Sequence, residues 1–236
     1  MIKDVLKGLY SELPATVKLV AVSKFHPIES IEEAYAAGQR CFGESRPQEL
    51  LAKVKALEEI RVLKGDAGYM SDVEWHFIGH LQTNKLKMVL PYVSLVQSVD
   101  SIRLLEAIDL WGRSNGKVTD VLLECHISSD ETKQGFSSEE ILDLLSSGKS
   151  YPNVRIRGVM GMASLTDDKE VIIADFRRLV DIHDMLADWI SETPLLPACG
   201  DYSEISMGMS GDYPLAVEMG ATLIRIGSMI FGERRY

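Results

Sequence analysis

The fold is decided by a unit that recurs along the chain, and its first copy is VKLVAVSKFHPIESIEEAYAAGQRCFG, residues 17–43. The apolar run at 17–22 has the Val-rich composition of a strand that is buried on both faces. An amphipathic segment at 30–37 follows, closed by Gly38, and a second short apolar run lies at 40–43. A strand, a helix and another strand in this order predict a parallel sheet with crossover helices.

The same alternation continues along the chain. We expect strands at residues 17–22, 40–43, 75–78, 93–96, 121–127, 154–160, 205–207 and 223–226. We expect helices at residues 30–37, 47–57, 83–89, 101–111, 138–145, 169–190 and 214–218, and a polar loop at 61–74. Eight such units in 236 residues predict an α/β protein with the (β/α)8 TIM-barrel fold, as a single domain over residues 1–236. An open doubly wound sheet is the alternative, but the turn after the first strand lacks the glycine-rich nucleotide motif of that fold.

The composition narrows the classes of function. Lys and Arg number 25 against 35 Asp and Glu, so the formal net charge is −10. This balance argues against binding to nucleic acid or to a membrane surface, and an anionic ligand would need a local pocket. No apolar stretch has the length of a signal peptide or membrane span, so we expect a cytoplasmic protein. Cys41, Cys125 and Cys199 lie far apart without a CxxC pattern, which predicts reduced core thiols.

A lysine marks the end of the first predicted strand. In TIM barrels the ligand site lies at the carboxyl ends of the strands, and Lys24 directly follows the first apolar run. Burial and a nearby cation such as Arg225 would favour the neutral amine, which is the form that attacks a carbonyl to give an imine. Lys24 is therefore a candidate Schiff-base lysine, and the alternative is a solvated lysine at a strand end.

Two loops rich in glycine and serine follow the last two predicted strands. The seventh strand continues into Ser-Met-Gly-Met-Ser-Gly at 206–211, and the eighth into Arg225, Gly227 and Ser228. Phosphate sites in TIM barrels are commonly built from these two loops, because glycine lets a phosphate approach the backbone N–H groups closely. The two loops together predict a phosphate site, although each alone is also typical of an ordinary turn.

Two histidines have a spacing that is found in metal sites. His76 and His80 are four residues apart, but their segment is predicted as a strand, where this spacing spans about 13 Å. That distance is too long for one shared ion, so we expect core or pocket-lining histidines and no metal site.

Seven motifs stand in the order expected for one known family. They are LVAVSK (19–24), FGESRPQE (42–49), WHFIGHLQTNK (75–85), KQGF (133–136), RGVMGM (157–162), SMGMSGD (206–212) and RIGSMIFG (225–232). From about residue 15 onwards, the chain resembles the YggS/PROSC family of pyridoxal phosphate homeostasis proteins, which are related to the barrel domain of alanine racemase.

The resemblance implies pyridoxal 5′-phosphate (PLP), bound as a Schiff base to Lys24, with its ring nitrogen facing Arg225. It implies that the phosphate lies near Ser206, Ser210, Gly227 and Ser228. The full set of cofactor-binding residues that it implies is Lys24, Ser45, His76, Met160, Ser206, Ser210, Arg225, Gly227 and Ser228. The second-strand motif of the family usually reads Gly-Glu-Asn, and here Ser45 stands in the place of the asparagine.

The resemblance also implies a function in intracellular PLP homeostasis, as a carrier or buffer without strong catalytic activity. A guanidinium only donates hydrogen bonds, so Arg225 would keep the ring nitrogen unprotonated and weaken the ring as an electron sink. The chain stops at Tyr236, without the second domain that supplies related racemases with another acid/base group and a dimer surface, so we expect a monomer. Apo forms of PLP-dependent enzymes are expected partners. A PLP-dependent amino-acid racemase or lyase and a lysine-imine aldolase acting on a sugar phosphate remain as alternatives.

Overall fold

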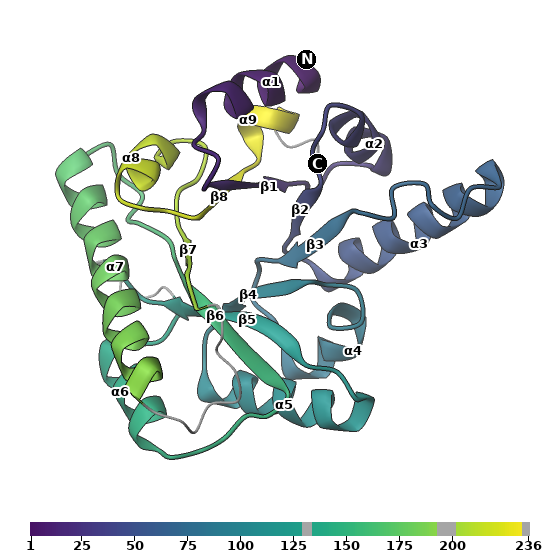
Figure 1. The fold of residues 1–236 in the computed structure, drawn as a ribbon. Coiled ribbons are helices and arrows are strands. Elements are labelled where there is room, and N and C mark those ends of the chain that lie inside the picture. Colours follow the sequence, from purple (N-terminus) through teal and green to yellow (C-terminus); the bar gives the residue numbers. More distant parts are fainter. Residues whose placement is uncertain (129–133, 193–201, 233–236) are drawn as a thin grey trace.

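Parallel strands close into a barrel, as the sequence predicts. The computed structural model describes residues 1–128, 134–192 and 202–232 (Figure 1). Within these residues the strands are β1 (Lys18–Val22), β2 (Cys41–Glu44), β3 (Glu74–Phe77), β4 (Leu95–Val99), β5 (Thr119–Cys125), β6 (Val154–Gly161), β7 (Glu204–Ser206) and β8 (Leu223–Ile226). Each strand pairs in parallel with the next, and β8 pairs with β1. The (β/α)8 prediction is confirmed.

The helices lie outside the ring of strands (Figure 1). They are α1 (Ile2–Glu12), α2 (Ile28–Ala36), α3 (Pro47–Lys64), η1 (Thr83–Lys85), α4 (Leu86–Val89), α5 (Ile102–Asn115), α6 (Ser138–Ser146), α7 (Lys169–Glu192), α8 (Tyr213–Glu218) and α9 (Ser228–Phe231). Among the helices that the structure describes, none has the length and apolarity needed to cross a bilayer.

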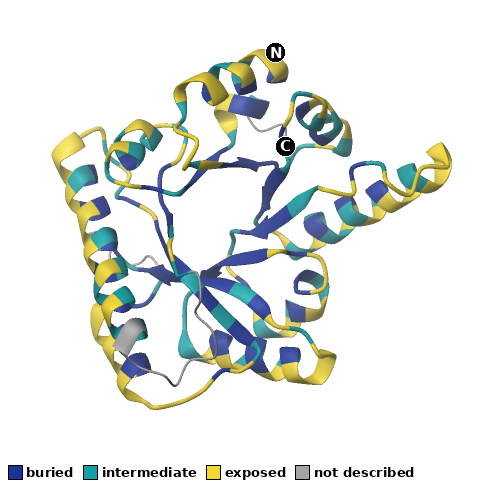
Figure 2. Cartoon of the chain, viewed as in Figure 1, coloured by how far each residue is buried: buried dark blue, intermediate teal, exposed yellow. Residues whose placement is uncertain are grey.

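The strands are largely buried, while the helices alternate buried and exposed residues (Figure 2). The larger core lies between the strands and the helices. A smaller buried cluster takes one residue from each of six strands: Val20, Cys41, Leu95, Leu122, Met160 and Leu223. Because side chains alternate along a strand, this second set fills the interior of the barrel. Cys41 and Cys125 are buried free thiols, as expected, and Cys199 lies outside the described residues.

Two helices were not predicted. α1 precedes the first strand-helix unit, and it buries Ile2, Leu6 and Leu9 at helical spacing against the core. α9 is a single turn that begins at Ser228, inside the segment predicted only as a phosphate loop. The repeat pattern misses both because neither helix connects two consecutive strands.

The prediction of a polar loop at 61–74 is wrong for residues 61–64, which are helical. α3 continues to Lys64 and ends at Gly65, whose φ of 61° provides the left-handed cap that commonly terminates a helix. The side chain of Arg61 then donates to the carbonyls of Tyr69 and Met70, at 2.8 and 2.9 Å. Arg61 thus binds the backbone of the loop that follows the helix, and Gly65 terminates the helix.

Candidate functional site

Lys24 lies in the tight turn that follows β1, at the carboxyl end of the barrel. The N–H of His26 donates to the carbonyl of Ser23 at 3.0 Å, and Lys24 is half-buried between them. Phe25 has a φ of 68°, in the left-handed region that residues other than glycine rarely adopt. A turn of this shape normally has glycine at that position, so surrounding contacts must hold this one.

The loops that follow β7 and β8 meet at this end of the barrel. The hydroxyl of Ser228 donates to that of Ser210 at 3.3 Å. Gly227 lies against the end of β1, since a Cβ added to it would stand 3.3 Å from both Cβ and the carbonyl oxygen of Val22. The structure therefore brings the two predicted phosphate loops together, next to the strand that leads to Lys24.

A buried chain of hydrogen bonds crosses the barrel below these loops. The guanidinium of Arg225 donates to Ser206 Oγ at 2.6 Å and to the carbonyl of Gly161 at 3.0 Å. The Ser206 hydroxyl donates to Gln97 Oε1 at 2.6 Å, and Gln97 Nε2 lies 2.8 Å from Nδ1 of His76. Burial lowers the pKa of Arg225 to about 10, so the guanidinium remains charged at neutral pH.

The direction of this chain is fixed by its first member. Arg225 can only donate, so the Ser206 oxygen accepts from it and the Ser206 hydroxyl donates to Gln97 Oε1. The Gln97 Nε2 group must then donate to His76. Nδ1 of His76 is then an acceptor, and the imidazole proton sits on Nε2. Burial lowers the pKa of His76 to about 3, so the ring is neutral.

Two predicted cofactor residues, Ser206 and His76, belong to this buried network. Ser206 is fully buried and bonded to Arg225 and Gln97, rather than joining Ser210 at the loop surface. His76 is buried inside the barrel, where it borders a cavity of about 180 Å³ whose other residues come from the amino ends of the strands. The geometry places Ser206 and His76 behind Arg225, so they can support its position.

Met160 and Ser45 occupy different settings. Met160 is buried in the interior cluster. Ser45 is half-buried just after β2, and its backbone packs so closely on Gly79 that a Cβ there would lie 2.3 Å from the Ser45 carbonyl oxygen. Met160 therefore belongs to the floor of the barrel, and Ser45 to its rim.

One group of side chains has the spacing of a metal site. In the described part of the chain, ligand atoms of Cys41, Glu74 and His76 lie within 4.8 Å of one another. The ammonium of Lys18 already contacts Glu74, and burial raises the pKa of the Cys41 thiol to about 12. The His76 Nε2 proton also faces this group. These features describe a hydrogen-bonded charge cluster better than a set of metal ligands.

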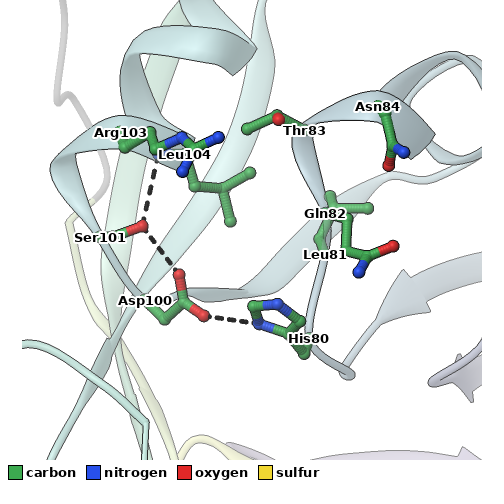
Figure 3. Close-up of a pocket in the computed structure, with 9 residues that line it drawn as sticks. All are labelled: His80, Leu81, Gln82, Thr83, Asn84, Asp100, Ser101, Arg103 and Leu104. Atoms are coloured by element: carbon green, nitrogen blue, oxygen red, sulfur yellow. Dashed lines mark hydrogen bonds and ion pairs between the residues drawn. The ribbon is translucent and has the colours of Figure 1, made fainter.

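A second cavity, of about 470 Å³, opens beside the barrel between η1 and the start of α5 (Figure 3). Nδ1 of His80 lies 2.9 Å from Oδ2 of Asp100, and Ser101 donates to the other carboxylate oxygen at 2.9 Å. His80 thus lines a pocket, as predicted.

Glu124, near the end of β5, is a buried acid that interacts with Arg225 and with the pair formed by His80 and Asp100. Burial, followed by the charge of Asp100, raises its pKa to about 7, while Arg225 and His80 act in the opposite direction. Sequence reasoning missed Gln97 and Glu124. Each follows an apolar run, Leu-Val at 95–96 and Val-Leu-Leu at 121–123, and a polar residue that continues such a buried run predicts an interior hydrogen-bond partner.

Comparisons with known proteins agree with this fold. Residues 2–235 match the family model of the alanine racemase N-terminal domain. The chain is 37% identical over 219 residues to the pyridoxal phosphate homeostasis protein of Aquifex aeolicus, covering 93% of this chain and 88% of that protein. It is 36% identical over 233 residues to the protein of the same name from Homo sapiens, covering 95% of this chain and 80% of that protein.

A solved structure gives the same result. PipY of Synechococcus elongatus, solved with PLP bound, matches with a TM-score of 0.83 and 35% sequence identity, covering 98% of this chain and 100% of that chain. The resemblance carried by the motifs is confirmed. This chain belongs to the pyridoxal phosphate homeostasis protein family, whose barrel is of the alanine racemase N-terminal domain type.

Proposed function

We propose that this protein binds PLP at the carboxyl end of its barrel and acts in PLP homeostasis as a carrier or buffer of the cofactor. Relatives at 36–37% identity bear the name pyridoxal phosphate homeostasis protein, and PipY was solved with PLP bound. The observation that carries the proposal is the meeting of the β7 and β8 loops, through Ser210 and Ser228, beside the strand that leads to Lys24.

The residues at this end suit an anionic aromatic aldehyde. The hydroxyls of Ser210 and Ser228 can turn from each other to phosphate oxygens, and Gly227 leaves the backbone of the β8 loop open to close approach. PLP supplies an aldehyde, which condenses with a neutral amine and releases water, so Lys24 would hold it covalently. The protein as a whole is acidic, so these local donors and Arg225 must provide the attraction for the phosphate and ring.

Arg225 explains why binding need not lead to catalysis. The guanidinium is buried and charged, and its hydrogen bonds to Ser206 and Gly161 fix its orientation. Placed at the ring nitrogen, it would donate and leave that nitrogen unprotonated. The ring is then a weaker electron sink than one that faces an acid, which favours storage and delivery over carbanion chemistry.

We further propose a cytoplasmic monomer, one domain over residues 1–236, that passes PLP to apo forms of PLP-dependent enzymes. In this site Ser45 and Met160 would border the cofactor, while His76 would act through Gln97. A reversible covalent bond to Lys24 suits delivery, because an acceptor can draw PLP away from it. The comparisons favour neither a racemase or lyase nor a sugar-phosphate aldolase.

A transfer assay tests the carrier function. The loaded protein is mixed with an apo PLP-dependent enzyme, with and without a trap that removes free PLP, and the recovered activity is followed. We expect recovery in both conditions, and no exchange of the α-hydrogen of amino acids in deuterated water by the protein itself. Rapid α-hydrogen exchange would contradict the carrier function and support an enzyme.

A further inference from the structure

A buried ion pair lies directly behind the turn that carries Lys24. Glu44, the last residue of β2, is fully buried, and its Oε1 accepts from Lys53 Nζ of α3 at 2.5 Å. The same carboxylate oxygen accepts from the hydroxyl of Ser23 at 2.6 Å. Lys53 Nζ also donates to the carbonyl of Ser23 at 2.8 Å. The hydroxyl and the carbonyl of Ser23 are therefore both anchored, one residue before Lys24.

The residue after Lys24 is anchored as well. The N–H of Phe25 donates to Glu49 Oε2 at 2.8 Å, and the guanidinium of Arg46 stacks 4.2 Å from the centre of the Phe25 ring. Glu49 also lies 4.0 Å from Lys53, so its contact with Phe25 is linked to the ion pair. These contacts account for the φ of 68° at Phe25, a conformation that persists only where its surroundings enforce it.

This arrangement is a poor way to gain stability. A buried ion pair seldom stabilises a protein more than apolar side chains of the same volume. In addition, Glu44 Oε2 is buried and has no hydrogen-bond partner in the described part of the chain. A strained turn next to an imperfectly satisfied buried charge is the pattern expected where geometry is held for a function.

We infer that Glu44, Glu49 and Lys53 form a clamp that positions Lys24 for attack on the PLP aldehyde. This inference rests on the proposed function. The clamp residues lie on β2 and α3 and contact the chain on both sides of Lys24, at the hydroxyl and carbonyl of Ser23 and at the N–H of Phe25. They are positioning residues, because none of them needs to touch the cofactor.

Glu49 provides the sharpest test, because its side chain is partly exposed and its loss should leave the fold intact. Glu49→Ala removes the acceptor for the Phe25 N–H, whereas Glu49→Gln keeps an oxygen at the same place. We expect Glu49→Ala to weaken PLP binding between about 10- and 100-fold, the loss that a misplaced reacting group causes, and to slow the appearance of the visible absorbance band. Glu49→Gln should keep most of the PLP affinity and most of the rate at which the band appears. Equal binding by Glu49→Ala and the wild type would overturn the clamp.

The ion pair is tested by removing both of its charges. The double variant Glu44→Gln with Lys53→Met leaves no unpaired buried charge, so the apo protein should melt within a few degrees of the wild type. We expect the same loss of PLP affinity, about 10- to 100-fold, because the Lys24 amine is again misplaced. The exposed pair Lys149 and Glu106 is the matched control, and Lys149→Met with Glu106→Gln should bind PLP normally. Unchanged affinity in a folded Glu44→Gln, Lys53→Met protein would refute the clamp.

Wild type and Lys24→Ala are measured alongside. If the wild type fails to bind PLP, the proposed function fails. If the wild type binds and all clamp variants bind equally well, the function stands and only the clamp is wrong. A double variant that does not fold leaves the decision to Glu49→Ala.

Discussion

Three buried residues of the barrel, Arg225, His76 and Glu124, differ in their charge at neutral pH, and burial is the main cause of each pKa shift. Arg225 keeps its charge although its pKa falls to about 10, and His76 is neutral with a pKa of about 3. Glu124 has a pKa raised to about 7, so at neutral pH it exchanges a proton easily. The same low-dielectric interior thus leaves a fixed charge, a fixed neutral ring and a titrating acid close together.

Glu124 makes the stability of the fold depend on pH. The pKa of Glu124 is about 7 in the folded protein, against 4.5, the ordinary value for a glutamate, in the unfolded chain. Below pH 4.5 both states hold the proton. Above it the unfolded state ionises first, so stability falls as the pH rises to about 7 and then levels off, by about 3 kcal/mol in total.

Glu124→Gln should remove this loss. Urea unfolding at pH 5 and pH 8 would measure it. From the lower to the higher pH, the free energy of unfolding of the variant should rise relative to that of the wild type by at most about 3 kcal/mol. An equal change with pH in the two proteins would contradict the assigned environment of Glu124.

The residues that the sequence predicts best are those whose role follows from their place at a strand end. Lys24, Ser210 and Ser228 were predicted in this way, and the structure places each of them after the end of a strand, while their part in binding stays a prediction. Gln97 could not be found in the same manner, because its partner Ser206 lies 109 residues away along the chain. Only closure of the barrel brings the two together.

At the scale of elements, β5 and β6 show why one glycine is required. The register between them shifts at Val121 and Leu122, next to Gly158, whose φ is 153°. A Cβ on Gly158 would lie 1.8 Å from the carbonyl oxygen of Glu204, on β7. The register shift at Gly158 therefore lets β6 pair with both β5 and β7, at a position where β7 lies too close for any side chain.

Gly158→Ala should destabilise the barrel by about 3 kcal/mol or more, from backbone strain together with the clash against β7. The matched control is Gly148→Ala, since Gly148 has a φ of 64° but open space around its Cβ position. That change should cost only about 1 kcal/mol. Denaturant midpoints measure both, and equal losses would show that the close approach of β6 to β7 has been misjudged.

The β7 and β8 loops act as a pair in the proposed grip on phosphate. Ser210→Ala and Ser228→Ala should each weaken PLP binding by roughly 10- to 100-fold, because each removes a hydrogen bond to a charged group worth about 1.5–3 kcal/mol. Pyridoxal, which has no phosphate, is the control ligand and should bind the variants and the wild type alike. Equal losses for PLP and pyridoxal would place the phosphate elsewhere.

The sequence predicts regular elements well where they repeat and poorly where they do not. The strands and the connecting helices follow from the alternating pattern, but α1 and α9 stand outside it. α3 also runs further than its apolar periodicity indicates, because Gly65 and the bonds of Arg61 set its end.

At the scale of the whole molecule, pairing of β1 with β8 is the step that creates the site. Ala21 lies opposite Ile226 in that pair, so Lys24 and the loop at Gly227 leave the barrel side by side. Residues about 200 positions apart in the sequence are joined only when the last strand closes on the first. The site therefore depends on a closed barrel, and the cofactor should bind only the folded chain.

A PLP titration followed by visible absorbance tests the central claim most directly. The wild type should develop the band of a lysine-linked cofactor, and borohydride reduction should fix one PLP mass on the peptide that contains Lys24. Lys24→Ala should show neither signal, while Lys55→Ala, which removes an exposed lysine of α3, should match the wild type. A normal band and a trapped adduct in Lys24→Ala would contradict the account.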